Sequence, residues 1–168
     1  INNGTLRLNH PSLDLALTTG DDSFVIPASG ALQISQGTAN VSGDDSGILL
    51  DGSIIVDGGT LDMDDPSNNG NNFIEYSASN NAQLQIIDGT VIVGSQIRRN
   101  TASEAGALQF TLGDGGSGTP SLNVRKNAAP ESSRGVFEIE NNAGSSFTFL
   151  NGSFVVMNQK ATAGIASL

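Results

Sequence analysis

The chain has 168 residues, enough to bury one hydrophobic core, and we expect a single domain over residues 1–168. Charged residues make up 14% of the chain against a usual share of about 25%, and turn-forming residues such as its 21 glycines take their place. The net charge of -10 disfavours a nucleic-acid partner because it repels phosphate, and the lack of cysteine excludes disulfides, thiolate nucleophiles and soft-metal sites.

The chain opens with INNGTLRLN, which contains neither the basic nor the apolar region of a secretion signal. No apolar run approaches the ~20 residues that a membrane helix needs, so we expect no membrane insertion. We therefore interpret the chain as a segment of a longer protein, or as one from which a signal was removed.

A short signal recurs along the chain, in which a small or polar residue, then Gly, then Thr or Ser leads into an alternating strand. Successive glycines of this signal lie 22 to 34 residues apart, a spacing typical of the coils of a solenoid. DGSIIV from Asp51 is a further copy that lies out of phase. The copies in phase are NGTLRL from Asn3, QGTANV from Gln36, GGTLDM from Gly58, DGTVIV from Asp88, SGTPSLNV from Ser117 and NGSFVVM from Asn151.

Two further apolar stretches precede the Gly-Thr strand in each step, so each coil offers three strands. They are short, alternate apolar with polar residues, and use the β-branched and aromatic types that suit a half-buried sheet. No segment predicts a helix longer than one turn, and the best candidate, residues 100–107, lacks a second turn of apolar spacing. The paired stretches are 24–26 with 31–34, 48–50 with 54–56, 73–76 with 84–87, 96–98 with 108–112, and 136–139 with 147–150.

These elements predict an all-β fold, a right-handed single-stranded parallel β-helix (β-solenoid) of about six coils with three short strands each. Stacked coils would place Leu61, Val91 and Val155 in one interior column. An antiparallel β-sandwich also has strands every 8 to 12 residues or so, but it gives no reason for a Gly-Thr corner to recur in phase. Loops are expected at residues 66–72, 95–106, 113–117 and 127–134.

The stretches GTLRLN, GALQISQGTANVSG and DGSIIVDGGTLDMDD resemble the repeats of bacterial surface proteins built on parallel β-helices. This group comprises autotransporter passengers and filamentous-haemagglutinin-like adhesins, and very large secreted adhesins are similar. The resemblance implies the right-handed solenoid, secretion or a cell-surface location, and adhesion. It carries no site residues to this chain.

Acidic pairs occur at Asp21/Asp22, at Asp44/Asp45 and at Asp64/Asp65. The last two pairs each follow the strand after a Gly-Thr corner, so the solenoid register would stack them one coil apart. Carboxylate oxygens suit Ca²⁺, which makes Asp44, Asp45, Asp64 and Asp65 a possible calcium site. The alternative is a solvated acidic edge, and no EF-hand or calcium-binding nonapeptide array is present.

Other reactive groups are sparse, and we predict no catalytic residue. His10 is the one histidine and precedes a proline, which favours an exposed loop position. The stretch 113–118 matches G-x-G-x-x-G but leads into an extended segment, so we interpret it as a loop rather than a phosphate site. Five basic residues could contact an anion, although balancing Glu104, Glu131 and Glu138 is the favoured interpretation. They are Arg98, Arg99, Arg125, Lys126 and Arg134.

A repeat without a reactive site favours a non-catalytic structural or adhesive module of a large secreted or cell-surface protein. Its expected partners are an extracellular glycan or protein surface and the neighbouring domains of the same chain. One alternative is a carbohydrate-active β-helix, because enzymes resembling pectate lyases share this fold. Another is a self-associating assembly unit, because exposed parallel edges pair readily.

Overall fold

The structure is a computed structural model that describes residues 2–17, 23–43, 46–64, 72–77, 81–100, 106–124, 135–141 and 143–156. Within these ranges every helix or strand element is a β-strand, which confirms the all-β prediction. The strands are β1 (Gly4–Ala16), β2 (Ser23–Ile26), β3 (Gly30–Asn40), β4 (Gly47–Leu50), β5 (Ser53–Met63), β6 (Phe73–Tyr76), β7 (Asn81–Val93), β8 (Ile97–Arg99), β9 (Ala107–Leu112), β10 (Ser121–Val124), β11 (Ser146–Phe149) and β12 (Ser153–Val156).

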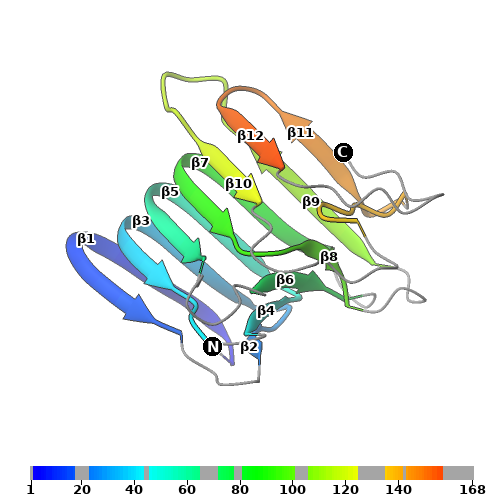
Figure 1. The fold of residues 1–168 in the computed structure, drawn as a ribbon, viewed down its shortest axis with the longest axis horizontal. Helices are drawn as coiled ribbons and strands as arrows, with labels where there is room; N and C mark the ends of the chain where they lie inside the picture. Colours follow the sequence, from blue (N-terminus) through cyan, green and yellow to red (C-terminus); the bar gives the residue numbers. More distant parts are fainter. Residues whose placement is uncertain are drawn as a thin grey trace.

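All strand pairs are parallel, and they form two sheets that stack as a β-solenoid (Figure 1). One sheet has the order β1-β3-β5-β7-β10-β12, with β9 pairing β7 and β11, and the other has the order β2-β4-β6-β8. Four successive turns have a described strand on every wall, and they are formed by β1 with β2, β3 with β4, β5 with β6, and β7 with β8. Parallel pairing excludes the antiparallel sandwich.

The four long strands β1, β3, β5 and β7 bend midway, so the larger sheet forms two walls (Figure 1). The first wall consists of residues 4–9, 30–36, 53–57 and 81–87 with β9 and β11. The second wall consists of residues 14–16, 38–40, 60–63 and 90–93 with β10 and β12. The third wall is the smaller sheet.

Apolar side chains from all three walls fill a continuous interior, because alternate residues of each strand point inward. The inward residues of successive coils pair directly, and nearly all of them are fully buried. Burying a side chain of this size contributes about 1.5–3 kcal/mol. The columns include Leu32–Ile54–Leu84–Phe110 on the first wall, Ala39–Leu61–Val91–Leu122 on the second and Ile48–Ile74–Ile97 on the third.

The Gly-Thr signal marks two different corners of the coil. Gly4 pairs with Gly30, and Ala31 pairs with Ser53, so NGTLRL and DGSIIV both lie on the first wall. QGTANV, GGTLDM and DGTVIV lie on the second wall, where Thr38 pairs with Thr60. We predicted that NGTLRL is in phase with these three copies and that DGSIIV is the one copy out of phase. This is wrong for NGTLRL, which lies on the same wall as DGSIIV. Both corners use the same small residues, so the motif alone does not distinguish them.

The last two copies also differ from the prediction. Ser121, rather than Thr119, pairs with Thr90, because the loop before β10 shifts the corner beyond Gly118. Leu122 pairs with Phe154, so Phe154 occupies the interior column, and Val155 is 38% exposed on the outer face. The prediction that Val155 shares the column of Leu61 and Val91 is wrong by one residue. A slip of one residue exchanges the two faces of a strand.

The corner glycines are required by close stacking of the backbone. Gly89 has a φ of 87°, and a Cβ there would lie 2.2 Å from the carbonyl oxygen of Gly59 on the coil before. Gly152 has a φ of 107°, and a Cβ there would lie 2.3 Å from the oxygen of Pro120. Both conditions exclude a side chain, which explains why glycine recurs at this corner.

The remaining predicted elements have mixed outcomes. The strand expected at 136–139 is reduced to one bridge between Ile97 and Phe137. The loop expected at 95–106 contains β8, whereas the loop at 113–117 is confirmed. Most of 66–72 and 101–105, and all of 127–134, lie outside the described residues.

Candidate functional site

The outer face of the first wall carries two columns of uncharged side chains along the axis of the solenoid. Strand pairing places each residue directly beside its equivalent on the next coil. The only charged member of either column is Arg7, on the first coil. We name both columns from the second coil onward, without Thr5 and Arg7 of the first coil, the neutral face. It consists of Ala31, Ser53, Gln83, Gln109 and Ser146 in one column and Gln33, Ile55, Gln85, Thr111 and Thr148 in the other.

Hydrogen bonds between coils hold the middle of the neutral face. Ser53 Oγ donates to Gln83 Oε1 at 3.2 Å, and Gln83 Nε2 donates to Gln109 Oε1 at 3.2 Å. Beside this ladder, Gln83, Gln85, Gln109 and Thr111 line a shallow open groove of about 170 Å³. Within the described part of the chain, the side chains of Gln85 and Thr111 make no hydrogen bond. The groove therefore offers amide and hydroxyl groups to a ligand.

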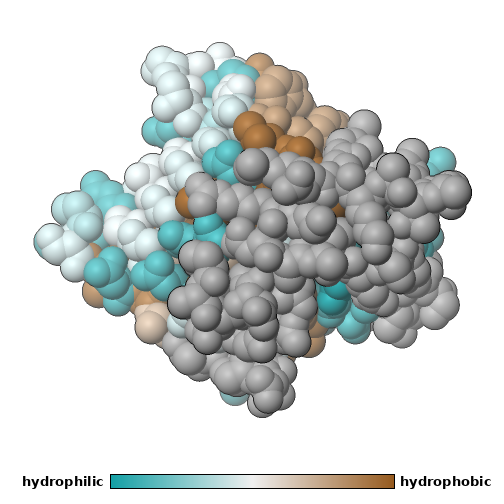
Figure 2. All heavy atoms as spheres, in the orientation of Figure 1, coloured by the Kyte–Doolittle hydropathy of each residue, from teal (hydrophilic) through white to brown (hydrophobic). Residues whose placement is uncertain are grey.

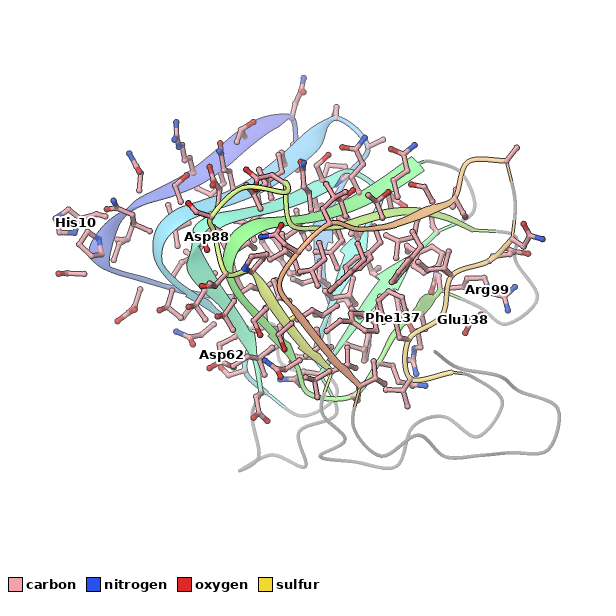
Figure 3. All side chains as sticks on the ribbon, turned by 90° about the horizontal axis from the view of Figure 1, so that it is seen from above. His10, Asp62, Asp88, Arg99, Phe137 and Glu138 are labelled. Carbon is pink, nitrogen blue, oxygen red and sulfur yellow. The ribbon has the colours of Figure 1, made fainter. Side chains whose placement is uncertain are left out.

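The outer face of the second wall presents hydroxyl groups at every described coil after the first. The side chains in register are Thr38, Thr60, Thr90, Ser121 and Ser153. The column beside them is mixed and consists of Asn40, Asp62, Ile92, Asn123 and Val155. Figure 2 shows this side of the molecule as mostly pale to teal surface, with brown surface near β11 and β12. In Figure 3, Asp62 lies on the outside of the ribbon.

Of the four aspartates predicted to bind calcium, only Asp64 is among the described residues. Its backbone N–H donates to Asp62 Oδ1 at 2.9 Å, a local turn contact. Asn40 pairs with Asp62, so the position level with Asp64 on the coil before is Ser42. Asp44, Asp45 and Asp65, like Asp21 and Asp22, lie outside the described residues. Among the residues that the structure describes, no three acidic or histidine side chains gather as a metal site, and the calcium site stays a prediction.

His10 is exposed, as predicted, but it lies within the bounds of β1 rather than in a loop (Figure 3). The pairing of β1 with β3 is interrupted between Asn9 and Asp14, so His10 stands on an irregular part of the strand. Its Nδ1 accepts a hydrogen bond from the N–H of Ser12 at 3.2 Å. This contact orients the ring beside its own backbone.

The G-x-G-x-x-G stretch is a loop held by side chains of neighbouring coils. Asn151 Oδ1 accepts from the N–H of Gly115 at 2.9 Å, and its Nδ2 donates to the oxygen of Gly118 at 2.8 Å. Asp88 Oδ1 accepts from the N–H of Thr119 at 3.0 Å. The strand β10 follows, and no helix N-terminus is present here. The prediction that this stretch is a loop is confirmed.

The third wall carries paired charges. Arg98 Nη2 lies 2.7 Å from Glu75 Oε1, and its guanidinium lies 4.6 Å from the centre of the Phe73 ring. Glu75 is only 8% exposed, so this pair neutralises a buried charge. Arg98 also donates to Gln96.

Arg99 is paired as well, because its Nε donates to Glu138 and its Nη1 lies 3.5 Å from Glu140 Oε1 (Figure 3). The predicted balance between arginines and Glu138 is thus confirmed for Arg99. Burial by itself lowers the pKa of Arg99. The hydrogen bond to Glu138 and the negative charges of Glu138 and Glu140 have the larger combined effect, so the pKa of Arg99 is raised. The other members of the basic grouping, Arg125, Lys126 and Arg134, lie outside the described residues, as do Glu104 and Glu131.

Tyr76 lies beneath this network and is fully buried. Its hydroxyl donates to the backbone oxygen of Glu138 at 2.7 Å. Burial raises the pKa of Tyr76 well above its usual value, and the nearby charge of Glu138 raises it further. The phenol therefore acts as a neutral hydrogen-bond donor that ties the segment around Glu138 to β6.

A small hollow of about 70 Å³ on the third wall is lined by Val25, Leu49, Asp51, Glu75 and Ser77, among others. Its acidic groups already have partners, since Ser77 Oγ donates to Asp51 and Arg98 pairs with Glu75. The hollow is therefore part of the charge network and offers less to a ligand than the groove of the neutral face.

Comparison with protein-family models, with curated proteins and with solved structures finds no match to this chain. The described residues contain no helix that is long and apolar enough to span a membrane.

Proposed function

We propose that this chain is a non-catalytic structural and adhesive segment of a large secreted or cell-surface protein. The full proposal is a right-handed solenoid of about six coils that acts as a stiff spacer, with its outer faces contacting an extracellular glycan or protein surface. The observation that carries the proposal is the neutral face, whose two columns are uncharged throughout and polar at eight of their ten positions, the exceptions being Ala31 and Ile55. A surface that repeats along the solenoid axis can make the same contact several times with a polymer of repeating units.

The interior supports the spacer role. Columns of apolar side chains run from coil to coil without interruption, and the buried charge of Glu75 is paired. Parallel ladders on three walls tie each coil to the next, so bending the rod would break several hydrogen bonds and contacts at once. Such a rod separates whatever precedes and follows it by a fixed distance.

The main alternative is a carbohydrate-active enzyme. Glycoside hydrolysis needs two carboxylates set across the sugar, and Asp57 and Asp88 are in register on neighbouring coils. However, Asp88 Oδ1 already accepts from the N–H groups of Gly89 and Thr119, which is a corner-holding role. This arrangement favours the structural proposal.

A glycan array followed by lyase and hydrolase assays, with and without Ca²⁺, tests the proposal. We expect binding to a polysaccharide or surface component without turnover. Turnover that is lost on substitution of Asp44, Asp64 or Asp88 would overturn the non-catalytic function, with a Gln36→Ala variant as the control for general damage.

A further inference from the structure

We infer that the groove of the neutral face, between Gln83 and Gln85 on β7 and Gln109 and Thr111 on β9, binds a strand of uncharged polysaccharide. The inference rests on the proposed adhesive function and adds the place and the chemical class of the ligand.

The absence of charged side chains from the neutral face favours an uncharged ligand. The chain carries a net charge of -10, yet both columns of the neutral face are uncharged from the second described coil onward. An anionic polymer would find no cation on this face and would be repelled by the rest of the chain. A cationic ligand would gain more from the acidic residues elsewhere. A neutral ligand is neither repelled by the negative charge of the chain nor attracted to its acidic residues elsewhere, so it is the class that this face favours.

The amide and hydroxyl side chains of the groove favour a ligand that is rich in hydroxyl groups. An amide offers both donors and acceptors, and a sugar hydroxyl does the same. Among the described residues, the side chains of Gln85 and Thr111 and the amide nitrogen of Gln109 are engaged in no hydrogen bond. Gln83 is fixed between Ser53 and Gln109, so part of the groove is ordered before a ligand arrives. Ordering in advance lowers the entropy that binding must overcome.

The shape of the groove favours a polysaccharide chain over a single sugar. The groove is shallow and open, and the polar columns continue beyond it to Ser53 on one side and to Ser146 and Thr148 on the other. A small sugar would bury little surface in such a groove, whereas a chain can contact several coils in turn. A second copy of this protein laid face to face is the competing occupant, because glutamine ladders also pack against one another.

Affinity electrophoresis of the full chain through gels containing dissolved polysaccharide tests the inference. The probes are a neutral β-glucan, a neutral galactomannan and a neutral xylan, against the anionic polymers polygalacturonate and alginate. The test variant is Gln85→Ala/Gln109→Ala. Gln36→Ala is the matched control, because it removes the same residue type from an exposed position of the first wall that lies outside both columns of the neutral face. Thermal melting followed by circular dichroism verifies that all variants fold.

We expect at least one neutral polysaccharide to retard the wild-type chain, and retardation to persist in about 0.5 M salt, where charge interactions are screened. The double variant should bind at least tenfold more weakly, which corresponds to about 1.4 kcal/mol and to one or two lost hydrogen bonds. Gln36→Ala should bind within about twofold of the wild type, since surface changes away from a site have small effects.

Three results would overturn the inference. They are retardation by anionic polymers alone, retardation that the double variant leaves unchanged, and a dimer in sedimentation that the double variant dissociates while no polysaccharide binds. Binding to a glycan array that survives the double variant would overturn this site but leave the adhesive function standing. A chain that binds no component of the array would overturn this site and adhesion to glycans, and would leave a protein surface as the ligand of the proposed function.

Discussion

Tyr76 gives a direct test of the buried third-wall network, because it is the one tyrosine of the chain and no tryptophan is present. The near-ultraviolet absorbance of tyrosinate therefore reports this residue alone. The ring is fully buried and its hydroxyl donates to the backbone oxygen of Glu138 at 2.7 Å. Because burial, followed by the charge of Glu138, raises the pKa of Tyr76, the phenol should stay protonated in the folded chain at pH values where an exposed tyrosine ionises.

The sign of the pH effect on stability follows from this shift. The folded chain holds the Tyr76 proton more tightly than the unfolded chain, so the contribution to stability is complete below the usual pKa of about 10. As the pH rises above that value, the unfolded chain loses its proton first. The free energy of unfolding should then fall by about 1.4 kcal/mol per pH unit until the phenol also ionises in the folded chain.

The assay combines a spectroscopic pH titration with denaturant unfolding at several pH values. Tyr76→Phe is the control, and it should remove this component of the pH dependence while other groups still titrate. At neutral pH the substitution should cost about 1–3 kcal/mol, because the buried oxygen of Glu138 loses its donor. A tyrosinate transition near pH 10 in the folded chain would refute the reasoning, since an ordinary pKa means that the ring is solvated.

Three more predictions concern the coil. Leu84→Ala should lower the free energy of unfolding by about 2–5 kcal/mol, because it opens a cavity in a fully buried column, whereas Gln85→Ala on the outer face should change it by less than about 0.5 kcal/mol. Phe154→Asp should destabilise the chain by at least about 2 kcal/mol, and Val155→Asp should have little effect; the reverse order in denaturant unfolding would contradict the register described here. Calcium should leave the melting temperature unchanged if the acidic pairs form a solvated edge, and a rise that Asp64→Asn abolishes would instead support a metal site.

The recurrence of Gly-Thr was sufficient to predict parallel stacking, because only stacked coils bring equivalent corners together. The phase of the first and last copies could not be predicted from the motif. The first-wall corner DGS at residues 51–53 and the second-wall corner DGT at residues 88–90 use the same residue types, and the strand after Gly152 contains three apolar residues in a row. Alternation cannot show which of Phe154, Val155 and Val156 points inward. Only the pairing with β10 decides it.

The neutral face could have been predicted from the sequence. Aligning ALQIS from Ala31, SIIVD from Ser53, QLQII from Gln83 and QFTLG from Gln109 places the glutamines of three copies on one side of the strand, once DGSIIV is recognised as part of the first wall. The Glu75–Arg98 pair is different. It depends on the register of β6 with β8, two short strands separated by a segment of irregular length, and no repeated motif fixes that register.

The three walls carry different outward-facing side chains, and this difference indicates which wall is suited to bind a ligand. The described charges of the third wall are paired with one another around Glu75, Arg98 and Arg99, so a ligand there would have to break ion pairs in a partly buried setting. The second wall offers hydroxyls, but the column beside them changes from Asp62 to Ile92 to Asn123 and repeats no contact. The neutral face of the first wall has no charged side chain in either of its columns, and its glutamines add amide donors and acceptors, some of which have no partner among the described residues. A polymer with a regular arrangement of hydroxyls is therefore better matched to that wall than to either of the others.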